Sequence, residues 1–117
     1  MCILLVVLCL ASACSTYTSG LNIPGKQTFI LGEYNDKNYT ATLFNTSPLP
    51  LVVNAINKNT GEVILHLELM PEDTRKMYVN KDEMVYIKNE NDISAKINVR
   101  LNRGVEGMRY VDIQSLR

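Results

Sequence analysis

The most regular pattern of hydrophobic and polar residues lies between positions 93 and 101. Apolar side chains stand at every second position there, and polar ones fill the positions between them. Because successive side chains of a β-strand point to opposite faces, this period of two predicts a strand with one buried and one solvent-facing side. The residues expected in the core are Ile93, Ala95, Ile97, Val99 and Leu101.

A second alternating segment belongs to a predicted hairpin. Residues 51–57 and 62–69 flank the short glycine-containing loop 58–61, which is typical of a hairpin connection. In the second arm the odd-numbered residues share one face and are expected to be core. They are Val63, Leu65, Leu67 and Leu69.

Further strand-like runs are separated by turn residues, and none shows a helical period. They cover residues 28–31, 39–44, 75–80, 83–88 and 108–113. About seven to eight short strands with frequent turn signals predict an all-β fold, a small antiparallel β-sandwich of immunoglobulin-like architecture. The Cys and Trp hallmarks of antibody domains are missing, so the expectation concerns architecture alone.

The N-terminus has a different pattern. Residues 3–10 are all apolar, and Ala11, Ser12 and Ala13 follow them. This is the layout of a secretory signal peptide, which we assign to residues 1–13. The apolar run is too short for a membrane-spanning helix, which needs about 20 apolar residues. Cys2 and Cys9 fall within the removed segment, so the mature chain keeps one thiol, which has no internal disulfide partner.

The residues from Leu10 to Cys14 resemble the lipobox of bacterial lipoproteins. The resemblance departs at Ala11, where the pattern prefers leucine, and no Lys or Arg precedes the apolar run. It implies that Cys14 is acylated and becomes the first mature residue, and that Ser15 directs the protein to the outer membrane, facing the periplasm. Two alternatives remain open, a soluble secreted protein cleaved at the A-x-A pattern and an unprocessed anchor.

Composition divides the mature chain into two parts. Residues 14–26 are predicted to form the N-terminus, lipidated as the lipobox resemblance implies, and a flexible tether, since residues 15–26 are rich in Ser, Thr, Gly and Asn. The tether's low charge argues against binding to lipid headgroups. Residues 27–117 form the β-sandwich domain. With 12 basic and 12 acidic residues, the chain lacks the charge excess of a nucleic-acid-binding protein.

Candidate chemistry is sparse. The single histidine, His66, lies on the polar side of its strand, where a solvated cross-strand partner is the simplest interpretation. The acidic pairs Glu33 with Asp36, Glu72 with Asp73 and Glu90 with Asp92 lie in turns and fit no calcium loop. We therefore predict no catalytic residue, no metal site and no cofactor.

The most promising partner surface combines tyrosines and lysines. If residues 75–80 and 83–88 pair as a hairpin, four side chains share one face, and tyrosine is favoured at interfaces. They are Lys76, Tyr78, Tyr86 and Lys88. The sequence thus predicts a membrane-tethered, non-catalytic β-domain of the bacterial cell envelope that binds a protein or cell-wall partner. The alternative is a small secreted or envelope-tethered hydrolase.

Overall fold

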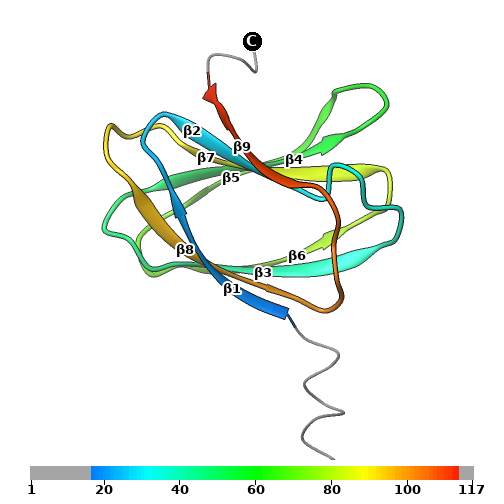
Figure 1. Cartoon of the computed structure of the whole chain (residues 1–117), viewed down its shortest axis with the longest axis horizontal. Coiled ribbons are helices and arrows are strands. Elements are labelled where there is room, and N and C mark those ends of the chain that lie inside the picture. The colour runs from blue at the N-terminus through cyan, green and yellow to red at the C-terminus, as the bar shows by residue number, and fades with distance from the viewer. Residues whose placement is uncertain (1–16, 114–117) are drawn as a thin grey trace, which may run out of the picture.

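The computed structural model describes residues 17–113, and this part of the chain forms a two-layered β-sandwich (Figure 1). The described residues contain nine antiparallel strands. They are β1 (Tyr17–Ile23), β2 (Gln27–Leu31), β3 (Tyr39–Asn45), β4 (Leu51–Asn57), β5 (Val63–Leu69), β6 (Thr74–Val79), β7 (Glu83–Asn89), β8 (Ala95–Leu101) and β9 (Met108–Asp112).

The strand order is that of a rolled-up ribbon. One sheet has the order β1-β8-β3-β6 and the other the order β5-β4-β7-β2-β9. β4 pairs with β5, β3 with β6, β2 with β7 and β1 with β8, so the pairs are nested around the central hairpin. Apart from the β4–β5 hairpin, each connection between consecutive described strands crosses from one sheet to the other. This nested arrangement is a jelly roll, with β9 added beside β2.

The all-β sandwich predicted from sequence is confirmed, but its immunoglobulin-like architecture is wrong. Immunoglobulin sheets follow orders such as ABED and CFG, in which several consecutive strands are neighbours. Here β4 and β5 are the consecutive strands that share a sheet. Alternation of apolar residues defines the faces of each strand but not its partners, so it could not distinguish the two arrangements.

The core fills the space between the sheets. In β8 the inward residues Ala95, Ile97, Val99 and Leu101 are buried, and the residues between them are exposed, as predicted. Ile93 is the exception, because it precedes the strand and is 63% exposed. Inward residues of β2, β3, β4 and β7 complete one continuous apolar cluster.

Strand β5 departs from its predicted burial. Leu67 and Leu69 are buried, but Val63 is 51% and Leu65 40% exposed. β5 is an edge strand, and its pairing with β4 is interrupted by a bulge at Ile64. Figure 1 shows this green hairpin extending past the rest of the sandwich, so its tip has no facing sheet to bury it.

The predicted tether also needs correction. Tyr17–Ile23 form β1, which pairs with β8 over seven positions. Gly20 and Asn22 are unfavourable in strands, but Tyr17 and Thr18 favour them. β1 is held by its pairing with β8, by the buried Ile23 and by the partly buried Leu21. The domain therefore begins at or before Tyr17. Cys14 and the predicted signal peptide lie outside the described residues.

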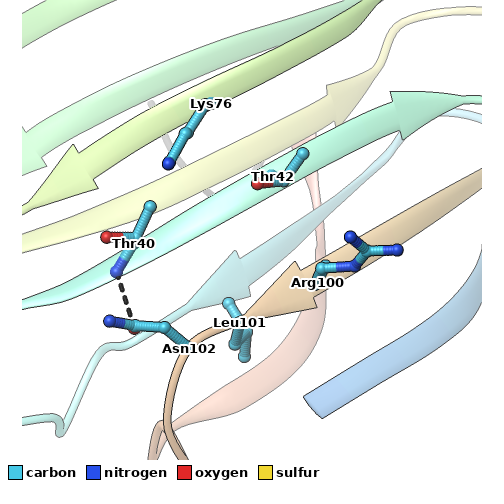
Figure 2. Close-up of a pocket in the computed structure, with 6 residues that line it drawn as sticks. All are labelled: Thr40, Thr42, Lys76, Arg100, Leu101 and Asn102. Carbon is cyan, nitrogen blue, oxygen red and sulfur yellow. Dashed lines mark hydrogen bonds between the residues drawn. The ribbon is translucent and has the colours of Figure 1, made fainter. Parts of the chain in front are cut away.

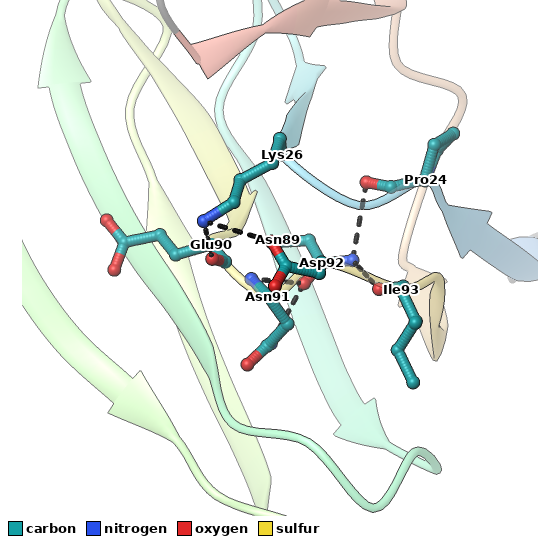
Figure 3. Close-up of polar contacts among 7 residues, drawn as sticks. All are labelled: Pro24, Lys26, Asn89, Glu90, Asn91, Asp92 and Ile93. Atoms are coloured by element: carbon teal, nitrogen blue, oxygen red, sulfur yellow. Dashed lines mark hydrogen bonds and ion pairs between the residues drawn. The ribbon is translucent and has the colours of Figure 1, made fainter.

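Two buried asparagines close one end of the core. The Asn45 amide donates to the carbonyls of Leu49 and Leu69, at 2.7 and 2.9 Å. The Asn89 amide donates to the carbonyls of Ile23 and Ile93, at 2.9 and 2.8 Å. Figure 3 shows the bond to Ile93 together with a longer one, of 3.3 Å, to the Pro24 carbonyl. Each asparagine thus ties its own following loop to a distant strand end.

Candidate functional site

The outer face of the four-stranded sheet carries one continuous row of polar side chains. Thr18 of β1 is opposite Arg100 of β8, Arg100 is opposite Thr42 of β3, and Thr42 is opposite Lys76 of β6. The row crosses all four strands. These positions face outward because their sequence neighbours, including Leu43, Met77 and Leu101, are buried in the core.

Two shallow hollows lie along this row and share Thr42 and Arg100. Figure 2 shows the first of them. The first has a volume of about 320 Å³ and is lined by Thr40, Thr42, Lys76, Arg100, Leu101 and Asn102. The second has a volume of about 260 Å³ and is lined by Thr18, Thr42, Phe44, Thr74, Asn98 and Arg100. The Thr40 backbone N–H donates to the Asn102 side-chain oxygen at 2.9 Å, which fixes the rim of the first hollow.

The charges of the two sheets differ, although the chain as a whole is neutral. Strands β1, β3, β6 and β8 contain no Asp or Glu. Their basic residues are Arg75, Lys76, Lys96 and Arg100. The five-stranded sheet carries both signs, with the carboxylates of Glu68, Glu83 and Asp112 and the cations of Lys88 and Arg109. Cations in strands that contain no carboxylate create a positive local potential that favours an anionic ligand.

An aromatic side chain borders the row. The Lys76 ammonium lies 5.8 Å from the centre of the Tyr78 ring, within the range of a cation–π contact. Tyr78 is 76% exposed, so most of its ring remains free for contact. Hydroxyl and amide groups of the hollows add uncharged donors that can bind an anion's oxygens. The site therefore suits a phosphate- or carboxylate-bearing partner.

The predicted partner surface is divided by the fold. Lys76 and Tyr78 lie beside the cationic row, but β7 belongs to the other sheet, so Tyr86 and Lys88 lie on the opposite outer face. The expected hairpin was wrong because the short 80–82 connection crosses between sheets instead of closing a hairpin within one. Both strands still bury alternate residues in the same core, from opposite sides.

Sequence reasoning placed Arg100 on a solvent-facing side but did not assign it a role. Its row partners come from positions 18, 42 and 76, which only the fold brings together. The sequence carried no distinguishing signal for this row, since the strand-like runs 28–31 and 51–57 of the other sheet also contain no Asp or Glu.

Tyr86 has a different environment. Arg109 donates to Glu33 at 2.7 and 3.0 Å, and this ion pair lies near the tyrosine. Burial raises the pKa of Tyr86, and the Glu33 carboxylate adds to the increase. The hydrogen bond from Arg109 lowers the pKa of Glu33. The outer face of the five-stranded sheet is consequently stabilised by the ion pair between Arg109 and Glu33.

The predicted role of His66 as a cross-strand partner is confirmed. Its Nδ1 lies 2.6 Å from the Asn54 side-chain oxygen, and the two residues are opposite each other on β5 and β4. Within residues 17–113, no three His, Cys, Asp or Glu side chains are grouped closely enough to hold a metal ion. The same residues include no helix long and apolar enough to cross a membrane.

Comparisons with known proteins identify the fold. No family model and no curated protein sequence matches the chain. Among solved structures, it is similar to the Yersinia pseudotuberculosis-derived mitogen, at 16% identity and a TM-score of 0.53, covering 79% of this chain and 88% of that one. A Cupin_2 domain of an XRE family transcriptional regulator from Enterobacter cloacae gives 11% identity and a TM-score of 0.53, covering 80% and 86%. The fold is that of cupin-like jelly rolls.

A third structure shows how widely this fold is used. Peruvianin-I, a cysteine peptidase from Thevetia peruviana latex, has 16% identity and a TM-score of 0.58, with 84% of this chain aligned. The chain spans 56% of that protein's length. Because an enzyme and a mitogen share the arrangement, the fold does not show whether this chain is catalytic.

Proposed function

We propose that this chain is a membrane-tethered, non-catalytic domain of the bacterial cell envelope that binds an anionic partner on the outer face of its four-stranded sheet. The observation that carries the proposal is the row from Thr18 to Lys76. It places Arg100 and Lys76 beside two hollows in a sheet whose strands contain no carboxylate.

The packing between the sheets supports a non-catalytic role. A small-molecule site needs a concavity with convergent polar groups. Here the inward side chains form a continuous apolar cluster that includes Ile97, Leu43 and Ile87. The single histidine is bound to Asn54 on an outer face. Polar groups suited to binding therefore gather on the surface of the sandwich.

Solution binding tests the role of the face. Long-chain polyphosphate serves as the anionic probe and dextran as the neutral one. Arg100→Glu should reduce polyphosphate affinity at least about tenfold, since it reverses a charge at the centre of the row. Lys88→Glu makes the same change of charge on the other sheet and should leave the affinity near that of wild type. Equal losses in both variants would mean that net charge matters and the row does not.

The tether is tested separately through Cys14. Two or three acyl chains give stable attachment, because each buried methylene contributes about 0.8 kcal/mol. Cys14→Ser should move the protein out of the membrane fraction. Unchanged fractionation would contradict acylation at this position. Protease shaving of intact cells should leave the protein uncut if it faces the periplasm.

A further inference from the structure

The position of β1 limits how far the domain can stand from a bilayer. Only Ser15 and Thr16 separate Cys14 from Tyr17, where β1 begins. An extended chain advances at most about 3.6 Å per residue, so the Cα atoms of Cys14 and Tyr17 lie within about 11 Å of each other. If Cys14 is acylated as proposed, the sandwich is held directly at the membrane surface.

The chain enters the fold at the cationic row. Tyr17 is opposite Leu101, and the next pair along the two strands is Thr18 with Arg100. From Thr18, the row crosses three strand spacings of about 4.8 Å each to reach Lys76. Summed along the chain and the strand spacings, Arg100 lies within about 20 Å of Cys14 and Lys76 within about 30 Å. The Debye length is about 8 Å at physiological salt, so a bilayer holding Cys14 attracts these cations when the sheet lies against it.

We propose that the partner of this face is the anionic headgroup layer of the membrane that anchors Cys14. The inference rests on the proposed function and names its partner. Charge complementarity selects this orientation, because the four-stranded sheet presents Lys76, Lys96 and Arg100 to phosphate. The outer face of the other sheet would present mixed charges to the same surface, from Glu68, Lys88 and Arg109.

Two aromatic side chains on the same face fit this orientation. Phe44 is 37% and Tyr78 76% exposed, and both lie in rows next to Arg100. Tyrosine is favoured at membrane interfaces because its ring is apolar and its hydroxyl is polar. The low charge of residues 15–23 suggested that the N-terminal segment does not bind lipid headgroups. The cations for headgroup contact come instead from β8 and β6.

Lysine accessibility on vesicles tests the orientation. The acylated full chain is reconstituted into vesicles of phosphatidylcholine alone or of phosphatidylcholine mixed with phosphatidylglycerol. A water-soluble amine reagent is then applied and read by mass spectrometry. Lys76 and Lys96 should react several-fold more slowly on the anionic vesicles, and high salt should restore their reactivity. Lys26, whose backbone bonds to Asn89 of β7 and to Ile113 after β9, and Lys88 of β7 should react equally on both.

A matched pair of variants controls for net charge. Lys96→Glu should weaken the protection of Lys76 about fivefold or more on anionic vesicles, whereas Lys88→Glu should retain it. The proposal is overturned if Lys76 and Lys96 react equally on both vesicles, or if all four lysines slow alike. If the lysines are not protected on anionic vesicles but the protein still binds polyphosphate, the face binds a soluble or cell-wall polyanion. The proposed function then stands without the membrane as partner. Loss of both would reject the two together.

Discussion

Arg100 and Lys76 lie on either side of Thr42, each as its direct cross-strand partner. Two cations are thus held about two strand spacings apart, roughly 10 Å, with no carboxylate in the strands around them. Like charges so placed repel each other, although the cation–π contact with Tyr78 offsets part of this for Lys76. A ligand that neutralises both would remove the repulsion.

The first prediction separates stability from binding at this pair. Lys76→Ala should change the free energy of unfolding by no more than about 0.5 kcal/mol, because the side chain is exposed and has no carboxylate partner on its sheet. The same variant should weaken polyphosphate binding. Urea denaturation and a binding titration on one preparation measure the two effects. A large loss of stability would show that Lys76 has a structural role instead.

The second prediction concerns the core strand. Ile97→Ala should cost about 2 to 5 kcal/mol, since Ile97 is fully buried between the sheets. Lys96→Ala, one residue earlier and exposed, should stay within about 0.5 kcal/mol. Chemical denaturation measures both. Similar values for the two variants would mean that β8 is covered on both faces.

The third prediction concerns the asparagine that ties β7 to β1. Asn89→Ala removes the donor that satisfies the carbonyls of Ile23 and Ile93. Each buried carbonyl left without a partner costs about 1 to 3 kcal/mol, so the loss should exceed that of an ordinary surface change. Asn98→Ala, on the exposed side of β8, is the matched control. Thermal unfolding that fails to distinguish the two variants would contradict this role.

The fourth prediction concerns acid sensitivity. The hydrogen bond from Arg109 lowers the pKa of Glu33, so the folded state holds this proton more weakly than the unfolded state does. The stabilisation is therefore present above the ordinary value of about 4.5 and is lost as the pH falls through the folded pKa. Glu33→Gln should remove this part of the pH dependence.

Arg109→Gln should have the same effect on the pH profile as Glu33→Gln, because either change breaks one ion pair. The double variant should then resemble each single one. Stability measured against pH by urea denaturation provides the comparison. Additive effects would show that the two side chains act independently.

Much of the fold was accessible from the sequence because alternation reports which residues face the core. It located the strands from β2 to β9 and the β4–β5 hairpin. It did not locate β1, whose polar residues gain their order from pairing with β8, about 80 positions away. Nor could it assign β6 and β7 to different sheets, since both bury alternate residues in one shared core.

Only part of the candidate site could be predicted from the sequence, for the same reason. Lys76 and Tyr78 were predicted as neighbours because they lie two positions apart on one strand. Tyr86 and Lys88 were joined to them by a hairpin that the chain does not form. Arg100, at the centre of the row, could be recognised only after β8 was placed between β1 and β3.

The salt dependence of polyphosphate binding tests the central claim most directly. Each phosphate neutralised by a cation adds roughly 0.7 to 0.9 to the slope of log affinity against log salt concentration. If Arg100 and Lys76 bind the anion, wild type should show a clear slope, and the Lys76→Ala, Arg100→Ala double variant should lose about 1.5 of it. An unchanged slope and affinity in a double variant that still unfolds cooperatively would contradict the claim.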